Sequence, residues 1–468
     1  MQFKRTLIAC SIAAALAAMS GTVAASGFAL IEQSASGLGN AYAGGAAGAE
    51  DASTIFFNPA GMSRLNGKQV AVALHAIKPS AKFSGSATGL APLQVAGAGE
   101  GGDAGDLTPI PNAYFTMEIN PQTRFGLGVN VPFGLKTEYD SDWMGRFQAI
   151  KSKLETVNLN PSLSYRLNDS VAIGAGVSYQ HIKGDLSSAV NYAGGVYGAV
   201  FGATISAAAA GAAATAAIMA GQGAGSSVIN GDDSAWGYNL GMLFKVSPQT
   251  RVGLAYRSTI KYNLSGSVGF TANRPTAATL TPVIGAGSAA AVAAGVAAAT
   301  ADGGVSLAIK MPDNFSASVF HQLNDKWDVM ADLNWTGWSV FQQLQVVRSS
   351  GATLLTVPEK WRDTWRVSFG ANHHYSEQWT SRIGLAFDQT PVSDTYRTAR
   401  IPDGDRTWLS LGGQYKPSVE SAVDFGYAHL FVKDSSIADM QAAAGKGNLV
   451  GNYKNSVDIL SVQYTRGF

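Results

Sequence analysis

The feature that most constrains the fold of this chain is an alternation of apolar and polar residues with a period of two. In the stretch 171–180 the odd positions are apolar, and they are Val171, Ile173, Ala175, Val177 and Tyr179. The stretch 251–264 alternates in the same way, with Val252, Leu254, Tyr256, Ile260, Tyr262 and Leu264 set against Arg251, Arg257, Lys261 and Asn263. Strands with one apolar and one polar face that recur along a chain are typical of a membrane β-barrel with a wet interior.

The composition fits one large barrel better than several soluble domains. Charged residues make up 14% of the 468 residues, aromatic residues make up 10%, and the formal net charge is +1. A chain that binds nucleic acid carries an excess of basic residues, so we expect no such partner here. No segment between Lys68 and Phe468 reads as a hinge between separate units, and we therefore predict a single barrel domain over 67–468.

The first residues have the layout of a secretory signal peptide. Lys4 and Arg5 precede an apolar stretch from Leu7 to Met19, and small residues follow near position 25. We expect cleavage of residues 1–25 on export. Cys10 is the only cysteine of the chain. Too little apolar sequence precedes it for a lipoprotein signal, so the exported chain should contain neither a disulfide nor a reactive thiol.

The connections between the predicted strands alternate between short turns and long loops. About fourteen strands result, which satisfies the even number found in bacterial single-chain barrels. We expect the short turns to face the periplasm and the long loops, including those at about 191–233 and 272–304, to face the exterior of a Gram-negative cell. Candidates for the aromatic girdles at the two membrane interfaces are Tyr165, Trp236, Tyr238, Trp327, Trp335, Trp338, Trp365, Trp379 and Trp408.

Two alanine-rich tracts, 199–220 and 284–300, fall within these two long loops. Hydropathy alone would assign the first tract as a membrane-spanning helix. A single helix between barrel strands would break the even topology, however, and alanine is a weak insertion signal. We therefore predict short external helices that pack against each other and form an apolar groove at the barrel mouth.

Residues 26–66 precede the first strand and are rich in glycine and alanine. Their glycine spacing does not indicate a nucleotide site, because no strand precedes it. Several motifs in this segment and beyond it resemble the FadL family of long-chain fatty acid outer-membrane transporters. They include Gly27-Phe28, Ser36-Gly37-Leu38-Gly39, Asn58-Pro59-Ala60, Asn158-Leu159-Asn160-Pro161-Ser162, Gly337-Trp338-Ser339-Val340-Phe341 and Ile401-Pro402-Asp403-Gly404-Asp405.

The resemblance implies an all-β membrane protein, a fourteen-stranded antiparallel outer-membrane β-barrel plugged by an N-terminal hatch. The hatch would comprise residues 26–66 and carry the motif Asn58, Pro59 and Ala60. The implied function is the uptake of long-chain fatty acids. The ligand would be captured in the external groove, pass to a pocket in the lumen, and leave sideways through the barrel wall. We expect a monomer in contact with outer-membrane lipid and lipopolysaccharide.

The same resemblance gives candidate residues for each step. The external groove would include Ile218, Met219 and Ile284, and the hatch residues Phe28 and Leu30 would touch an apolar tail. The gap in the wall would lie on the third strand, within 124–133, at Gly126, Gly128 and Pro132, because proline cannot donate a ladder hydrogen bond. Cations that could bind a fatty carboxylate, although each also fits an ordinary solvated charge, are Arg146, Lys151, Arg257, Lys261 and Lys310.

Three other functions compete with this interpretation. Uptake of aromatic or other hydrocarbons by the same route would need no cation, and the sequence does not separate it from fatty acid uptake. A diffusion porin needs an open polar channel, which the hatch segment and the apolar tracts argue against. An enzyme is disfavoured, because no paired carboxylates, metal ligands or serine–histidine arrangement stand out, and we expect no cofactor and no metal.

Overall fold

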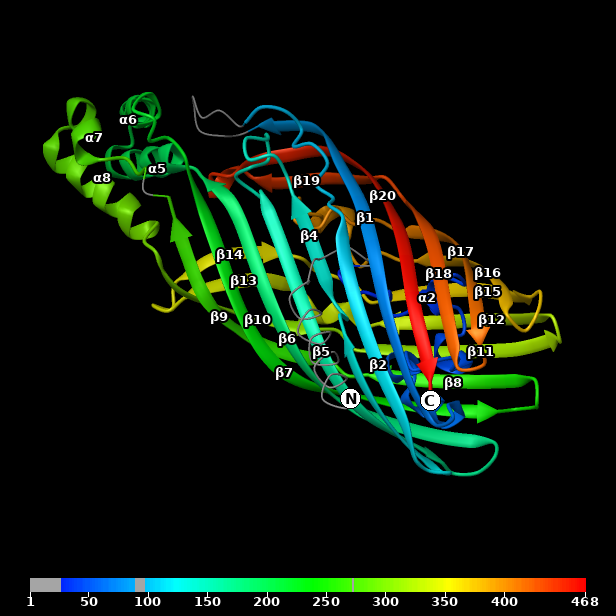
Figure 1. Cartoon of the computed structure of the whole chain (residues 1–468). Coiled ribbons are helices and arrows are strands. Elements are labelled where there is room, and N and C mark those ends of the chain that lie inside the picture. Colours follow the sequence, from blue (N-terminus) through cyan, green and yellow to red (C-terminus); the bar gives the residue numbers. More distant parts are fainter. Residues whose placement is uncertain (1–26, 89–96, 272) are drawn as a thin grey trace, which may run out of the picture.

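The chain forms one closed antiparallel barrel (Figure 1), seen in a computed structural model that describes residues 27–88, 97–271 and 273–468. All twenty strands of these residues belong to a single sheet. The last strand, β20 (Gly447–Gly467), pairs with β18 (Ser421–Val432) on one side and with β1 (Lys68–Thr88) on the other, and this pairing closes the barrel. The predicted signal peptide, 1–25, lies outside the described residues.

Six of the spanning strands are each divided into two pieces, so the twenty strands make the fourteen that the sequence predicts. The divided strands are β3 (Thr123–Asn130) with β4 (Gly134–Glu138), β8 (Thr250–Arg257) with β9 (Ile260–Phe270), β10 (Gly303–Met311) with β11 (Asn314–Asn324), β12 (Trp327–Thr336) with β13 (Gln343–Arg348), β14 (Thr353–Pro358) with β15 (Thr364–His374), and β18 with β19 (Ser435–Gln441). The undivided strands are β1, β2 (Thr108–Asn120), β5 (Lys151–Arg166), β6 (Val171–Val190), β7 (Gly225–Lys245), β16 (Trp379–Asp388), β17 (Arg406–Ser418) and β20.

The alternation on β6 has the predicted orientation. Val177 and Tyr179 are 46% and 41% exposed on the outer face, whereas Ser178 and Gln180 are buried in the interior. Most of the girdle candidates also lie on the outer surface, among them Trp236, Trp327, Trp365 and Trp379. The prediction was wrong for Trp338 and Trp408, which are fully buried within the barrel.

The alternation on the seventh spanning strand reverses partway, which the sequence prediction did not anticipate. Arg251 and Arg257 of β8 contact the hatch and therefore point inward. The strand is then interrupted at residues 258–259, between the end of β8 and the start of β9. Beyond the break Tyr262 and its neighbours Ile260 and Leu264 are buried inside the barrel, so the prediction that these three residues face outward was wrong.

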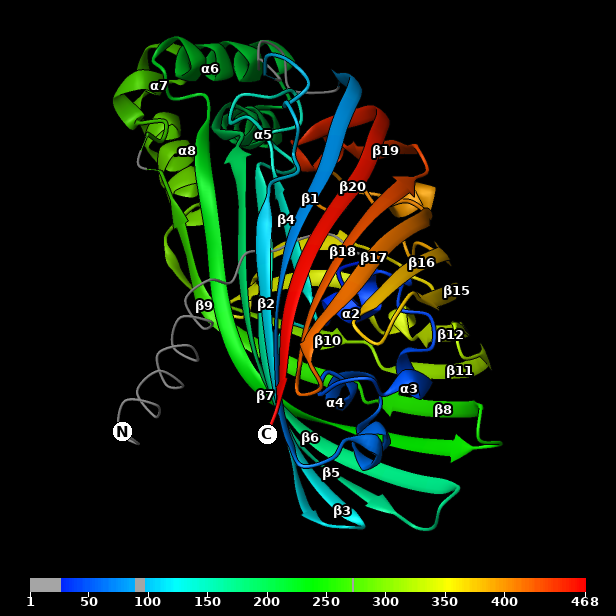
Figure 2. The same ribbon diagram turned by 45° about the vertical axis from the view of Figure 1, so that its right-hand side comes forward.

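Two groups of helices occupy different places. The hatch helices α2 (Ala35–Leu38), α3 (Gly45–Gly48), α4 (Thr54–Phe57) and the 3-10 helix η1 (Pro59–Arg64) lie within the ring of strands (Figure 2). The helices α5 (Tyr192–Thr204), α6 (Ala207–Met219), α7 (Ala277–Ile284) and α8 (Ala286–Ala299) gather at one end of the barrel (Figure 1). Short 3-10 turns are η2 (Trp338–Val340), η3 (Asp394–Tyr396) and η4 (Ala442–Ala444). Among the described residues, no helix is both long and apolar enough to cross a membrane.

The four external helices pack against each other as predicted. Their shared core contains Val196 and Val200 of α5, Leu280 of α7, and Val292 and Val296 of α8. Alanine fills the remaining contacts, and its small side chain lets the helices approach closely. The alanine-rich tracts therefore fold as a helical cap at one end of the barrel.

Asn58 fastens the hatch to the barrel wall. Its Nδ2 donates to the carbonyl oxygens of Ala46, at 2.7 Å, and of Met242 on β7, at 2.9 Å, while its Oδ1 accepts from the backbone N–H of Ala60. Gly241 beside it must lack a side chain, because a Cβ there would lie 1.9 Å from Asn58 Oδ1. Pro59 begins η1, where its missing N–H costs no hydrogen bond.

Candidate binding path through the barrel

Three cavities follow one another from the helical cap into the barrel. The outer cavity encloses about 1670 Å³ of space, including its open mouth, and lies among the ends of β6, β7 and β9, the start of α5, the end of α8 and the turn at η4. Its apolar lining comprises Phe147, Val190, Ile229, Val268, Phe270, Leu354 and Leu355. Such a lining suits an alkyl chain or another hydrophobic compound.

The middle cavity, about 700 Å³, is lined almost entirely by aliphatic and aromatic side chains. Leu186 and Ile229 border both the outer and the middle cavity, which places the two next to each other. The remaining apolar lining comprises Phe28, Leu135, Leu154, Ile182, Leu264, Val305, Leu307, Ile309, Phe341, Leu344, Val346 and Ile401. Since burial of a methylene group is worth about 0.8 kcal/mol, this cavity favours a long apolar tail.

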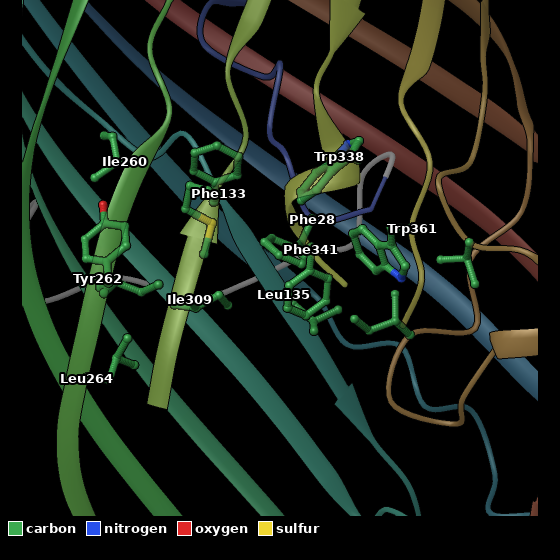
Figure 3. Packing of buried hydrophobic residues seen from close by; sticks show 14 residues of the cluster. Phe28, Phe133, Leu135, Ile260, Tyr262, Leu264, Ile309, Trp338, Phe341 and Trp361 are labelled. Atoms are coloured by element: carbon green, nitrogen blue, oxygen red, sulfur yellow. The ribbon is translucent and has the colours of Figure 1, made fainter. Parts of the chain in front are cut away.

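A cluster of aromatic rings surrounds Phe28 (Figure 3). Phe28 and Phe341 line the middle cavity, whereas Trp338 and Phe133 line the next cavity inward, so the cluster lies between the two. The ring of Phe28 lies 4.6 Å from that of Trp338, 5.3 Å from that of Trp361 and 5.7 Å from that of Phe341, measured between centroids. Phe133, from the break in the third spanning strand, completes the cluster at 6.3 Å. Phe28 belongs to the hatch, so the hatch itself forms part of this constriction.

The luminal pocket lies beyond the aromatic cluster and encloses about 1010 Å³. Its apolar walls include the hatch residues Ala29, Leu30 and Ile31, and Phe56 and Phe57 of α4. Its polar lining includes Arg257, Arg366, Asp388, Trp338 and Trp408. The pocket therefore combines an apolar wall with grouped hydrogen-bond donors and a carboxylate, Asp388.

Several donors of the luminal pocket are buried without a hydrogen-bond acceptor. The side-chain N–H groups of Trp338, Trp408 and Arg366 Nε have no partner in the described part of the chain. Arg257 stacks on the ring of Phe56 at 4.3 Å and donates to the Phe56 carbonyl oxygen and to Ser178 Oγ, but it forms no ion pair with any residue that the structure describes. A buried donor without an acceptor costs about 1–3 kcal/mol, so these groups favour a ligand that supplies an acceptor.

The barrel wall is interrupted next to this pocket, at residues 131–133 between β3 and β4. β3 pairs with both β2 and β5, whereas β4 pairs with β5 alone. The amino end of the hatch takes up the hydrogen bonds of the break. Leu30 N–H donates to the Pro132 carbonyl oxygen at 2.8 Å, and Gly134 N–H donates to the Phe28 carbonyl oxygen at 2.9 Å. The hatch thus seals the break from inside.

Glu32 lies two residues farther along this sealing segment and is buried. Its carbonyl oxygen accepts from Asn112 Nδ2 at 2.9 Å, and its Oε2 has no partner among the described residues. Burial raises the pKa of the Glu32 carboxyl to about 7, although the nearby Arg406 and Arg366 act in the opposite direction. The segment that seals the wall therefore carries a carboxyl that titrates near neutral pH.

The five cations predicted from the sequence as carboxylate ligands lie in different parts of the structure. Arg257 alone lines the luminal pocket. Lys151 pairs with Glu138 at 3.2 Å, and Arg146 stacks over Phe147 at 5.0 Å. Lys261 and Lys310 are cross-strand neighbours with exposed side chains on the outer face of β9 and β10. The prediction that Lys261 faces the lumen was wrong, because the break at 258–259 reverses the alternation.

The groove and gap candidates are also distributed differently from the prediction. Met219 is 84% exposed, Ile218 is half-buried, and Ile284 packs against the core of the helical cap, so none of them lines the outer cavity. Pro132 lies in the wall break. Gly126 and Gly128 do not, since both are paired on each side with β2 and β5, and a Cβ on Gly126 would touch the hatch residues Met62 and Ile55.

Sequence reasoning missed most of the residues that line the path. Trp338 and Trp408 were assigned to the membrane girdle because position near a strand end does not tell the inner face from the outer one. Arg366 lines the luminal pocket, and Arg400 and Lys446 line the outer cavity. These three residues carried no distinguishing signal, because their neighbours in space come from distant parts of the chain. The one usable signal was the motif at 337–344, whose Trp338 and Phe341 both reach the aromatic cluster.

Comparison with known proteins agrees with this architecture. Residues 16–468 match the family model described as outer membrane protein transport protein (OMPP1/FadL/TodX). The chain is 30% identical over 429 residues to the long-chain fatty acid transport protein of Escherichia coli K12, covering 90% of this chain and 91% of that one. The crystal structure of a Pseudomonas aeruginosa FadL homologue has a TM-score of 0.79 and 28% identity over 94% of this chain and 99% of that one.

A more distant structure shares the fold. The Ralstonia pickettii toluene transporter TbuX has a TM-score of 0.61 and 19% identity, covering 92% of this chain and 99% of that one. The family match extends over nearly the whole chain, and the barrel and the hatch described above agree with it. The chain belongs to the FadL family of outer-membrane transport proteins.

Proposed function

We propose that this transporter takes up long-chain fatty acids, in preference to aromatic or other hydrocarbons. The observation that carries the proposal is the set of buried donors in the luminal pocket, where Trp338, Trp408 and Arg366 each present an unpartnered N–H beside Arg257. A carboxylate accepts several hydrogen bonds and neutralises a cation. A hydrocarbon does neither.

The discrimination follows from the cost of burying polar groups. A pocket built to hydrogen-bond a ligand rejects an analogue that lacks the group, because the donors of the pocket then stay desolvated and unpaired. The alkyl chain is recognised separately, by the apolar lining of the middle cavity as the ligand enters and by Leu30, Ile31 and Phe56 of the hatch once it lies in the luminal pocket. Together these features select an amphiphile with one acidic end.

In the proposed route, the ligand lodges first in the outer cavity under the helical cap and then passes into the middle cavity. It moves past Phe28 into the luminal pocket, and it leaves through the wall break at 131–133. Ala29, Leu30 and Ile31 line the luminal pocket and belong to the segment that seals the break. A ligand in the pocket therefore touches the segment that has to move before the ligand can leave.

The relatives point the same way. The E. coli relative, at 30% identity, is named for long-chain fatty acids. TbuX, named for toluene, shares the fold at 19% identity, and hydrocarbon uptake by the same path is the alternative. A diffusion porin fits less well, because the hatch and the aromatic cluster occupy the lumen.

Competition binding tests the proposal. The refolded protein in detergent would be loaded with a fluorescent fatty acid, which is then displaced by oleate or by toluene. We expect saturable displacement by oleate, and we expect Arg257→Gln to weaken it about tenfold, as loss of one charge-assisted bond predicts. Arg466→Gln is the control, because Arg466 lies on the exposed end of β20 and pairs with Glu420. Displacement by toluene alone, with Arg257→Gln unchanged, would instead favour hydrocarbon uptake.

A further inference from the structure

The outer cavity has an electrostatic asymmetry that its apolar lining does not explain. The charged side chains that line it are Arg400 and Lys446, both of them cationic, and no carboxylate of the described residues lines it. The cavity is thus mainly apolar, and the only charged residues described in its lining are positive. A cavity that takes up uncharged hydrocarbons has no use for two cations, each of which loses hydration there.

The two cations differ in how they are held. Arg400 is buried and its guanidinium donates to the carbonyl oxygens of Gln148, at 2.9 Å, and Lys151, and to Ser152 Oγ at 3.0 Å. Its hydrogen bonds are occupied, so it acts mainly as a fixed positive charge. Lys446 is half-buried, and within the described part of the chain its ammonium group forms neither a hydrogen bond nor an ion pair.

The charges around Lys446 leave its own charge only partly balanced. Burial, together with the positive charge of Arg400, lowers the pKa of Lys446 to about 8, and Asp439 acts in the opposite direction. Asp439 forms no ion pair with Lys446, and its Oδ2 accepts from Gln441 Nε2 at 2.8 Å. The carboxyl group of Glu359 lies close enough to Arg400 to favour its charged form when that carboxyl is ionised. Burial raises the pKa of the Glu359 carboxyl to about 8, so this carboxyl is largely neutral at pH 7.

The shape of the cavity places this cation relative to a tail. The outer cavity meets the middle cavity at Leu186 and Ile229, and the middle cavity is lined mainly by apolar side chains. The one cation of the described chain that lines it, Lys153, is already paired with Glu155 at 2.7 Å. A single-chain amphiphile held by its head in the outer cavity can therefore extend its tail into the middle cavity. The reverse orientation would place a charged head in the apolar middle cavity, which is costly.

We propose that Lys446, supported by the fixed charge of Arg400, is a binding site for the carboxylate of a single-chain amphiphile, and that it orients the ligand so that its tail enters the barrel first. The inference rests on the proposed uptake of fatty acids and adds an outer headgroup site to it. Lys446 is a binding residue at the mouth, whereas Arg257 acts in the luminal pocket.

The test uses a reporter in the outer cavity. Ala443 lines this cavity and is exposed, and the only cysteine of the sequence, Cys10, lies in the predicted signal peptide. Ala443→Cys therefore carries a single environment-sensitive fluorophore in the full barrel, reconstituted in nanodiscs. The probes are dodecanoate and 1-dodecanol, which differ only in the charged head. Total binding is measured in parallel by displacement of a fluorescent fatty acid.

We expect Lys446→Gln to weaken the dodecanoate response of the reporter about two- to fivefold and to leave the dodecanol response unchanged, as loss of one partly exposed ionic contact predicts. Lys446→Arg should retain the response. In the protein with Lys446, the dodecanoate response should be lost as the pH rises through about 8. The Lys446→Arg variant should keep the response, because arginine stays charged. Lys433→Gln, at an exposed lysine outside the cavity, should have no effect.

The outcomes separate the two proposals. A dodecanoate response that does not depend on Lys446, or equal losses for both probes, would overturn the headgroup site while dodecanoate still displaces the fluorescent ligand. Failure of dodecanoate to displace that ligand at all would overturn the proposed function as well.

Discussion

Replacement of Phe28 by alanine should loosen the seal over the wall break without unfolding the barrel. The Phe28 ring is 1% exposed and packs against Trp338, Trp361, Phe341 and Phe133. Removal of a fully buried phenylalanine ring costs about 3–5 kcal/mol. The barrel ladder does not depend on this ring, so the cost should fall on the docking of the hatch segment 27–33 against the wall.

The two main-chain hydrogen bonds of the seal remain in the Phe28→Ala variant, but they are too weak to hold the segment in place. Leu30 N–H and Gly134 N–H make the two main-chain hydrogen bonds across the break, and each is worth about 1 kcal/mol net. The packing energy lost with the Phe28 ring, about 3–5 kcal/mol, is therefore larger than the stabilisation that these two hydrogen bonds still provide. Since about 1.4 kcal/mol corresponds to a factor of ten, the open population of the segment should rise by about two to four orders of magnitude.

Amide hydrogen exchange in nanodiscs measures this directly, because Leu30 and Gly134 donate the bonds that must break. Their exchange should accelerate by about the factor given above, and the ion conductance of the barrel in planar bilayers should rise with it. Phe83→Ala is the matched control. Phe83 packs on Trp143 at 5.7 Å and Tyr453 at 5.4 Å, away from the hatch. Exchange at Leu30 and Gly134 within twofold of the unmodified protein would refute the view that Phe28 holds the seal.

Other perturbations of the hatch should give graded effects. Asn58→Ala removes two side-chain hydrogen bonds to main-chain carbonyl oxygens and should lower hatch protection against proteolysis by about 1–3 kcal/mol, whereas substitution of the exposed Asn324 should not. Burial raises the pKa of Glu32 to about 7, so the docked segment keeps a proton that the undocked segment loses above about pH 4.5. Docking should therefore weaken as the pH rises from about 4.5 to about 7, and Glu32→Gln should abolish this dependence in exchange measurements. Deletion of residues 27–66 should raise the ion conductance, and an unchanged low conductance would show that they do not plug the lumen. Gly126→Val should disturb the seating of the hatch, because its side chain would collide with Met62 and Ile55, and an intact hatch with reduced uptake would return Gly126 to the exit path.

The period-two pattern was sufficient for the strands and their number. It depends on burial of one face against lipid, which acts on every residue of a strand in the same way, and each short turn between strands carries its own local signal. The helices at the end of the barrel were predictable because their signal is also local: alanine has a high intrinsic helix propensity. The path was harder to predict because it runs through places where the regular strand is broken.

Lys261 shows this limit in physical terms. A break of two residues at 258–259 turns the strand over, so that Tyr262 enters the lumen and Lys261 leaves it. Nothing in the local sequence fixes that reversal, because the residues on both sides of the break still alternate. Lys446 is a second case, since the cavity that it lines is also formed by α5, the end of α8 and β14, which come from three different loops.

The arrangement of the hatch makes ligand binding and opening of the wall thermodynamically linked. The same segment presents Leu30 and Ile31 to the luminal pocket and closes the break with the main-chain groups of Phe28 and Leu30. A ligand opens the seal only if it binds more tightly when the segment has moved than when the segment is docked. In the proposed route, the unpartnered donors at Trp338 and Arg366 would bind a carboxylate equally in both states, so they would hold the ligand without opening the wall. The opening force must then come from the tail, which competes with Phe28 for the aromatic cluster. Longer chains should consequently open the seal more than short ones of the same charge, and Phe28→Ala should make exchange at Leu30 insensitive to chain length.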